Sequence, residues 1–330
     1  MPTDDTKLFL PNLFLPKRRK PLRIGLVNNM PDAALRATER QFAELIANAA
    51  RLLGFGFPML TLSLFHISEI PRNPEIAAEL AATSADVATL GEAGLDALVV
   101  TGGEALLPDM RAEPHWAKMA ALIATTAAQE LPVLWSCRAA HAAVLHLDGI
   151  ERVRLQEKLS GVFQTELVGD APVLRHLAGN PLTPQSRYNT LDAAQLRAND
   201  YVILTQSAEA GPDWFTRAAS PHMLFVQGHP EYNANALGLE YRRDVRRFLN
   251  GETAHHPALP TSYFSPALRQ RLQDLAATAI QQRDPALLHR LDDVLATHTP
   301  RQRWRETAVE LYAGWLETIA AKARPAVIAA

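Results

Sequence analysis

Cys137 is the only cysteine of the chain, and it stands between an apolar stretch and a helical one. A thiol at the N-terminus of a helix faces the positive end of the helix dipole, which favours the reactive thiolate. The first N–H groups of that helix, beginning with Arg138, have no intrahelical partner and can hold a developing oxyanion. Gly102 and Gly103 end another apolar stretch and are expected to add backbone donors, because glycine permits close approach. The alternative for a lone cysteine is a buried structural residue.

A histidine and a carboxylate follow a further apolar stretch, in the sequence Gly228-His229-Pro230-Glu231-Tyr232. Histidine is the usual base for activating a thiol, and Glu231 can orient the ring of His229 from two residues away. On their own these residues are equally typical of a surface loop. Together with Cys137 they predict nucleophilic catalysis, because all three follow apolar strand-like stretches.

Short apolar runs that alternate with helical patterns are expected to position these groups. Strands are predicted over residues 22–27, 59–65, 95–101 and 132–136, and helices over 32–53, 114–130 and 138–147. Such alternation is typical of a parallel sheet with helices on both faces. Ligands bind at the carboxyl ends of the strands in such sheets, which is where Cys137, Gly102 and Gly103 fall.

The pattern changes toward the C-terminus. Strands are still predicted over residues 201–205 and 223–227, but only helices follow Tyr263, with a stripe of leucines at Leu268, Leu272 and Leu275. Thr299-Pro300 has the cap and the first-turn proline of a helix start. The expected parts are an N-terminal tail over 1–20, an α/β catalytic domain over 21–263 and a helical extension packed on it over 264–330.

Composition and charge exclude several classes of protein. The chain has 330 residues, 48% of them hydrophobic, which is enough for a large core. A formal net charge of -2 argues against nucleic-acid binding, and no apolar stretch is long enough to span a membrane. The single cysteine rules out an internal disulfide and indicates a cytoplasmic protein. The basic run at residues 17–20 indicates a solvated tail, with binding of phosphate or anionic lipid as the alternative.

Ordered blocks along the chain resemble known proteins. The order of Cys137, His229 and Glu231 resembles the triad of class I glutamine amidotransferases. Further blocks resemble the homoserine O-succinyltransferase family, which shares that fold but transfers acyl groups from acyl-CoA. These blocks are Val27-Asn28-Asn29-Met30-Pro31, Arg72-Asn73-Pro74, Val100-Thr101-Gly102-Gly103, Glu157-Lys158-Leu159-Ser160-Gly161-Val162-Phe163, Ser186-Arg187-Tyr188, Gly228-His229-Pro230-Glu231-Tyr232, Glu240-Tyr241-Arg242-Arg243-Asp244, and Trp304-Arg305 through Trp315-Leu316.

The resemblance implies a fold, a reaction and the residues that carry it out. The fold is an α/β, doubly wound, mostly parallel sheet of the amidotransferase-like and flavodoxin-like type, with extra C-terminal helices. The reaction is a ping-pong transfer from acyl-CoA to the hydroxyl of homoserine in methionine biosynthesis, with no bound cofactor and no metal. Cys137 corresponds to the acyl-accepting nucleophile, His229 to the general base and Glu231 to its partner. The residues that match binders of the amino-acid substrate are Lys158, Ser186 and Arg243.

Two departures from the family pattern concern the substrate. The nucleophile turn of the family is usually Cys-Trp-Gly-Ala-Gln, whereas here it is Cys137-Arg138-Ala139-Ala140-His141. Residues 267–300 form a helical insertion that typical members lack.

The alternatives to homoserine O-succinyl transfer are a homoserine or serine O-acetyltransferase, a glutamine amidotransferase or glutaminase, and an inactive regulatory protein. For Lys158 and Arg243 the alternative is a surface salt bridge. The expected partners are small-molecule substrates, with no nucleic acid and no membrane, and a homodimer is one possible assembly.

The acyl donor is expected to be succinyl-CoA, with acetyl-CoA as the alternative. In the resembling family a position shortly after Val-Thr-Gly discriminates donors: glutamate accompanies acetyl, and glycine accompanies succinyl. A carboxylate at that position would repel the free carboxylate of a succinyl group. Without gaps the position is Leu106, which carries no charge; with a shifted register it is Glu104.

Overall fold

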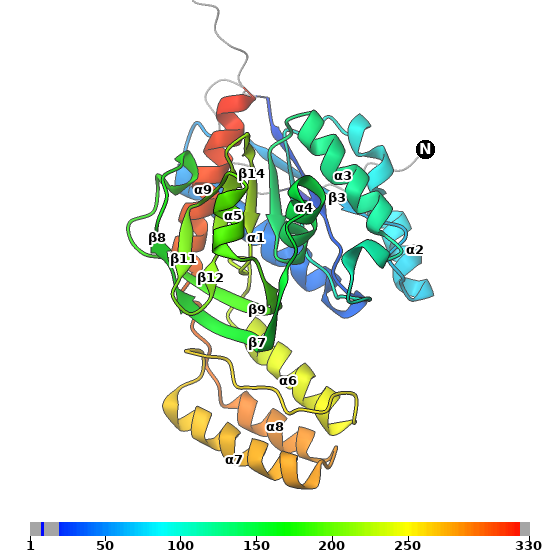
Figure 1. Cartoon of the computed structure of the whole chain (residues 1–330), viewed down its shortest axis with the longest axis vertical. Coiled ribbons are helices and arrows are strands. Elements are labelled where there is room, and N and C mark those ends of the chain that lie inside the picture. The colour runs from blue at the N-terminus through cyan, green and yellow to red at the C-terminus, as the bar shows by residue number, and fades with distance from the viewer. Residues whose placement is uncertain (1–7, 10–19, 324–330) are drawn as a thin grey trace, which may run out of the picture.

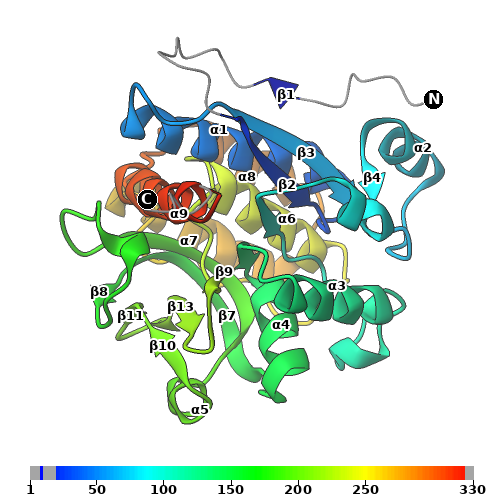
Figure 2. The same ribbon diagram turned by 90° about the horizontal axis from the view of Figure 1, so that it is seen from above.

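A nine-stranded, mostly parallel β-sheet forms the centre of the protein, whose computed structural model describes residues 8–9 and 20–323 (Figures 1 and 2). The strands run in the order β1-β3-β2-β5-β6-β14-β13-β10, with β4 beside β3. The inner strands pair in parallel, while β1 and the β14-β13-β10 edge pair antiparallel. Their bounds are β1 Leu8–Phe9, β2 Leu22–Val27, β3 Leu60–His66, β4 Ala85–Asp86, β5 Ala97–Val100, β6 Val133–Ser136, β10 Tyr201–Ile203, β13 Trp214–Arg217 and β14 Ser220–Val226.

The register of the central strands aligns the candidate chemistry at one edge. Val100 of β5 pairs with Trp135 of β6, and Ser136 of β6 pairs with Val226 of β14. All three strands run in parallel, so the residues that follow them emerge side by side. Gly102, Cys137 and His229 therefore share the carboxyl edge of the sheet, as the apolar strands predict.

Helices cover both faces of the sheet, as Figure 2 shows for α1 and α9 on one side and α3 and α4 on the other. The predicted helix over 32–53 begins as the 3-10 turn η1 Asp32–Ala34 and continues as α1, which buries Leu35, Phe42 and Ile46. The helices of these layers are α1 Leu35–Leu53, α2 Pro74–Thr83, α3 Trp116–Ala128, α4 Arg138–Asp148, α5 Ala193–Ala198 and α9 Arg305–Lys322, with the 3-10 turns η2 Val87–Glu92, η3 Met110–Ala112 and η4 Pro172–Leu174. The predicted α/β fold with a mostly parallel sheet is confirmed.

An antiparallel ribbon of β7 Val153–Gln164 and β9 Leu182–Thr190 forms a separate two-stranded sheet and was not predicted. Gly161 adopts φ 148° against the backbone of Thr261, where a Cβ would lie 2.5 Å from the Thr261 oxygen. A smaller sheet joins β8 Glu166–Leu167, β11 Thr205–Ser207 and β12 Gly211–Pro212, so the strand predicted over 201–205 is divided between β10 and β11.

The C-terminal helices fall into two groups (Figure 1). The helices α7 Pro266–Gln282 and α8 Leu287–Ala296 pack on α6 Ala236–Leu249, away from the sheet, and bury the predicted leucine stripe. In contrast, α9 returns to the sheet and shares one core with α1. The helix start predicted at Thr299-Pro300 is wrong: α9 begins at Arg305, because the buried Trp304 anchors the preceding segment by donating from Nε1 to the Tyr232 carbonyl at 2.8 Å.

The predicted N-terminal tail over 1–20 falls largely outside the described residues, as does the basic run apart from Lys20. Strand β1 adds to the sheet beside β3. Among the helices of residues 20–323, none combines the length and apolarity that a membrane span requires.

Candidate active site

Cys137 occupies a sharp turn between β6 and α4. Its backbone adopts φ 51° and ψ -114°, a conformation that is rare for residues other than glycine. The backbone N–H of Cys137 donates to the Val226 carbonyl at 2.6 Å, which ties the turn to the neighbouring strand. This geometry lifts the thiol, which is partly exposed, out of the sheet edge at the start of a helix. Such backbone strain is typical of functional sites.

His229 and Glu231 form a buried pair next to this thiol. The Nδ1 atom of His229 lies 2.8 Å from Oε1 of Glu231, and both side chains are almost fully buried. Burial lowers the pKa of His229, but the adjacent Cys137 and Glu231 side chains outweigh burial and raise this pKa well above its usual value. The imidazole therefore has a strong tendency to take and hold a proton beside Cys137, as a base that activates a thiol must.

The backbone donors around Cys137 suit a developing negative charge. A Cβ added at Gly102 would lie 3.1 Å from the Arg138 nitrogen and 3.4 Å from the Cys137 Cβ, so only glycine leaves this approach open. Gly102, Gly103 and Arg138 all line the cavity that contains Cys137. None of the hydrogen bonds found within residues 20–323 uses the N–H of Gly102, Gly103 or Arg138.

The cavity around Cys137, hereafter the Cys137 cavity, also brings together the predicted substrate-binding residues. Lys158 comes from β7, Ser186 from β9 and Arg243 from α6, and all three line this cavity with His229. Further cations on its wall are Arg138, Arg152, Arg154, Arg187 and Arg247. A cavity with so many guanidinium groups favours anionic substrates.

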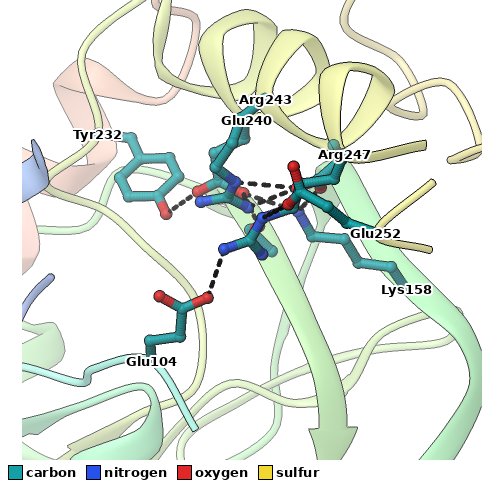
Figure 3. Close-up of polar contacts among 9 residues, drawn as sticks. Glu104, Lys158, Tyr232, Glu240, Arg243, Arg247 and Glu252 are labelled. Carbon is teal, nitrogen blue, oxygen red and sulfur yellow. Dashed lines mark hydrogen bonds and ion pairs between the residues drawn. The ribbon is translucent and has the colours of Figure 1, made fainter. Parts of the chain in front are cut away.

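Glu240 on α6 organises these residues and was not singled out from the sequence (Figure 3). Lys158 Nζ lies 2.8 Å from Glu240 and 2.7 Å from Asp244, and the hydroxyls of Ser186 and Tyr232 also donate to Glu240. Burial raises the pKa of Glu240, but the charges of Lys158 and Arg243 outweigh it and lower this pKa to about 2. The sequence signals that could have found it were the family block over Glu240–Asp244 and the four-residue spacing of these two carboxylates on one helix.

The predicted substrate-binding residues thus differ in how much of them remains available. Lys158 is committed to Glu240 and Asp244, so its salt bridges are internal to the site and not on the surface. Arg243 pairs with Asp244 at 2.8 Å, yet 43% of its side-chain surface is exposed. Of Lys158 and Arg243, Arg243 therefore keeps more of its charged surface accessible from the cavity.

The two candidate donor-specificity residues lie in different surroundings. Glu104 lines the Cys137 cavity and pairs with Arg247 of α6 at 2.7 Å, so its charge is compensated (Figure 3). Leu106 lines only an adjoining cavity, which Glu104 lines as well. The altered nucleophile turn is also explained: Arg138 pairs with Glu113, and His141 bonds to Gln227 at 2.9 Å, with burial lowering the pKa of His141 to about 3.

No cluster of three or more His, Cys, Asp or Glu side chains in residues 20–323 is arranged to hold a metal ion.

The fold and its strand-end residues define an α/β protein whose single cysteine stands beside a buried histidine–glutamate pair. Solved structures with a similar topology include glutamine amidotransferases from Thermotoga maritima (TM-score 0.48, 14% identity, 91% of this chain and 99% of that one) and Methylobacillus flagellatus (TM-score 0.49, 15% identity, 90% and 94%).

The chain belongs to the homoserine O-succinyltransferase family, whose model matches residues 15–326. A homoserine O-succinyltransferase of Rhodopseudomonas palustris is 42% identical over 91% of this chain and 89% of its own length. One from Methylorubrum extorquens is 42% identical over 90% and 87%, and one from Bradyrhizobium japonicum is 40% identical over 91% and 90%. The family predicted from the sequence blocks is confirmed.

Proposed function

We propose that this protein transfers a succinyl group from succinyl-CoA to the hydroxyl of homoserine, a step of methionine biosynthesis, through a thioester on Cys137. The observation that carries the proposal is that Cys137 and His229 meet in one cation-lined cavity, with Glu231 hydrogen-bonded to the Nδ1 atom of His229. Membership of the homoserine O-succinyltransferase family supports the same substrates. We also infer a cytoplasmic location, because a lone cysteine used as a nucleophile suits a reducing compartment.

The first half-reaction acylates Cys137. His229 takes the thiol proton at Nε2, since Nδ1 faces Glu231, and the sulfur bonds to the thioester carbon of succinyl-CoA. The N–H groups of Gly102, Gly103 and Arg138 hold the oxygen as it becomes negative. The bond between the acyl carbon and the CoA sulfur then breaks, and the CoA thiol leaves with the proton from His229.

The second half-reaction moves the acyl group to the acceptor. Arg243 binds the homoserine carboxylate, because a guanidinium holds a carboxylate by two charge-assisted hydrogen bonds and Arg243 is still half-exposed. His229 takes the hydroxyl proton, the oxygen bonds to the acyl carbon, and the bond to the Cys137 sulfur breaks. Cys137 regains the proton. Lys158 and Ser186 act by holding Glu240, and through it the helix that carries Arg243.

The test weighs the intact protein after incubation with succinyl-CoA or acetyl-CoA, and again after adding homoserine or serine. We expect one succinyl group on the wild type, none on Cys137→Ala, and its release by homoserine. Preferential acetylation of Cys137 would identify acetyl-CoA as the donor in place of succinyl-CoA. Release of the acyl group by serine alone would identify serine as the acceptor in place of homoserine. Release of glutamate from glutamine without any acyl-enzyme would make the protein a glutaminase. Failure of both acylation and rapid iodoacetamide labelling would make it an inactive relative.

A further inference from the structure

A second cavity adjoins the Cys137 cavity and shares Pro31, Gly102, Gly103, Glu104 and Arg138 with it. We call it the Arg72 cavity. Its apolar wall includes Ile70, Met110, Trp116 and Met119, and its polar wall includes Asn29, Asp32, Arg72, Thr101, Glu104, Glu113, His115 and Arg138. Each of the three carboxylates on this wall pairs with an arginine: Asp32 with Arg72, Glu104 with Arg247 and Glu113 with Arg138. These residues come from distant parts of the chain, so the cavity exists only in the folded protein.

The polar wall of the Arg72 cavity contains a concentration of unpaired groups. Fourteen buried side-chain nitrogen or oxygen atoms lack a hydrogen-bond partner in the described part of the chain, and six of them belong to residues that line this cavity. Buried polar groups are normally paired, so a local excess of unpaired ones indicates a missing ligand. The six are Asn29 Oδ1, Arg72 Nε, Arg72 Nη2, Glu113 Oε2, His115 Nδ1 and Arg138 Nε. Glu113 Oε2 lies 3.2 Å from His115 Nε2.

Arg72 presents the most specific of these groups. Its side chain is only 6% exposed, and its Nη1 atom donates to the Met30 carbonyl and to Asp32, the latter at 3.1 Å. The two unpaired atoms, Nε and Nη2, form the other edge of the same planar guanidinium. That edge carries two parallel N–H bonds, which match the two oxygens of a carboxylate. Asp32 thus fixes the plane of Arg72 while leaving this edge for a ligand.

We propose that the Arg72 cavity takes the acyl group of the donor, with its terminal carboxylate on the Nε–Nη2 edge of Arg72; this rests on the proposed function. The apolar wall then contacts the two methylene groups between the thioester carbon and the carboxylate. Arg72 is a residue that selects a four-carbon acyl group with a terminal carboxylate over an uncharged one. Leu106 lines the same cavity, contacts the acyl chain and limits the space available to it.

The loop above the cavity is held in a way that supports this role. One oxygen of Glu113, Oε1, accepts hydrogen bonds from the backbone N–H of Leu106 at 3.0 Å and of Leu107 at 3.2 Å. The same oxygen accepts from the guanidinium of Arg138, the residue that follows the nucleophile. Glu113 therefore ties the loop of Leu106 to the nucleophile turn, at the place where the two cavities share Arg138.

The experiment compares succinyl-CoA with butyryl-CoA, which has a methyl group in place of the carboxylate. The rate of Cys137 acylation is measured by intact mass without acceptor, in the full-length protein. For Arg72→Gln we expect the succinyl rate to fall by about 10²-fold, as for the loss of a two-pronged charged contact. The butyryl rate should stay within about threefold. Arg72→Lys keeps the charge but lacks the two-pronged edge, and should give an intermediate succinyl rate.

Arg111→Gln is the matched control, because Arg111 is an exposed arginine near the same loop that pairs with Asp109 and Glu151 outside the cavity. It should leave the ratio of the two rates unchanged. An equal fall for both donors in both Arg72 variants would make Arg72 a structural residue and overturn the inference, as would no change for either donor. A wild type that accepts butyryl-CoA but not succinyl-CoA would instead overturn the proposed function itself, before any variant is tested.

Discussion

The ring of Tyr232 stacks on the ring of His229, with centroids 4.3 Å apart and planes inclined by 17°. The hydroxyl of Tyr232 donates to Glu240, which also accepts from Lys158 and Ser186. His229, the proposed base, is thereby packed against a side chain that is bonded to Glu240, next to the proposed acceptor-binding residue Arg243. The orientation of His229 and the arrangement of α6 are physically connected through this one tyrosine.

Tyr232→Phe tests this connection. The stacked ring is kept and only the hydrogen bond to Glu240 is lost, so acylation of Cys137 should stay within about threefold of wild type. Transfer to homoserine should fall by roughly 10- to 150-fold, since a hydrogen bond to a charged group is worth roughly 1.5–3 kcal/mol. Rapid-quench measurement of both half-reactions decides it. Equal effects on both steps would show that the hydroxyl does not act through the acceptor side.

A second prediction concerns Cys137, the proposed nucleophile, and His229, its proposed base. Cys137→Ala should abolish the acyl-enzyme while the unfolding midpoint stays close to that of wild type, because one small residue replaces another. His229→Ala should lower acylation by at least about 10²-fold, the range for loss of a general base, and Glu231→Gln by less. Intact mass and kcat/KM measure these effects. Turnover by Cys137→Ala near the wild-type rate would exclude the thioester route.

Arg243→Lys should separate the two half-reactions. A lysine keeps the positive charge but not the two-pronged geometry, so binding of the homoserine carboxylate is weakened while acylation of Cys137 is spared. Acyl-enzyme should then accumulate when succinyl-CoA and homoserine are both present, which intact mass would detect. Equal losses in both steps would assign Arg243 to the CoA site or to the scaffold.

The low pKa of Glu240 predicts a pH-dependent stability. The pKa of its carboxyl falls from 4.5 to about 2 on folding, so the stabilisation is fully present above pH 4.5 and is lost as the pH falls toward 2. The free energy of unfolding of Glu240→Gln should therefore lie up to about 3 kcal/mol below wild type near neutral pH. The gap should close in acid. The control is Glu252→Gln, because Glu252 is an exposed partner of Arg247. Its free energy of unfolding should stay close to that of wild type both near neutral pH and in acid.

Donor choice can be tested at the two positions considered from the sequence. Leu106→Gly enlarges the Arg72 cavity and should raise kcat/KM for succinyl-CoA relative to acetyl-CoA. Glu104→Ala should change that ratio little, because Arg247 already compensates the charge of Glu104 at 2.7 Å. If only Glu104→Ala shifts the ratio, the position that discriminates donors is Glu104 and not Leu106.

Sequence patterns predicted the parts of the fold where burial is uniform. Strands such as Val133–Ser136 are buried on both faces and appear as continuous apolar runs, so they were found almost to the residue. The β7–β9 ribbon was missed because most of β7 is exposed or half-buried and polar, which gives no clear alternation. The start of α9 was misplaced because a tertiary contact of Trp304 overrides the local signal of Thr299-Pro300.

The candidate site was predictable to a similar extent and for related reasons. Cys137, His229 and Glu231 follow strand ends, where chemistry is expected in such sheets. Glu240 stands in one of the family blocks but has the helical spacing of a charged residue on a helix surface, and only the fold shows its contacts with Lys158, Ser186 and Tyr232. The unpaired edge of Arg72 likewise has no signature in the sequence, because it depends on what the rest of the chain does not supply.

Helix α6 contacts both the Cys137 cavity and the α7–α8 pair. One side carries Glu240 and Arg243 into the Cys137 cavity, and the other packs Val245 and Phe248 against α7 and α8. Substitutions within the α7–α8 pair can therefore shift the proposed acceptor-binding residue Arg243 while leaving Cys137, His229 and the backbone donors beside them in place. Acceptor preference can then evolve as a separate trait, by drift in a peripheral pair of helices, while the thioester chemistry is inherited unchanged.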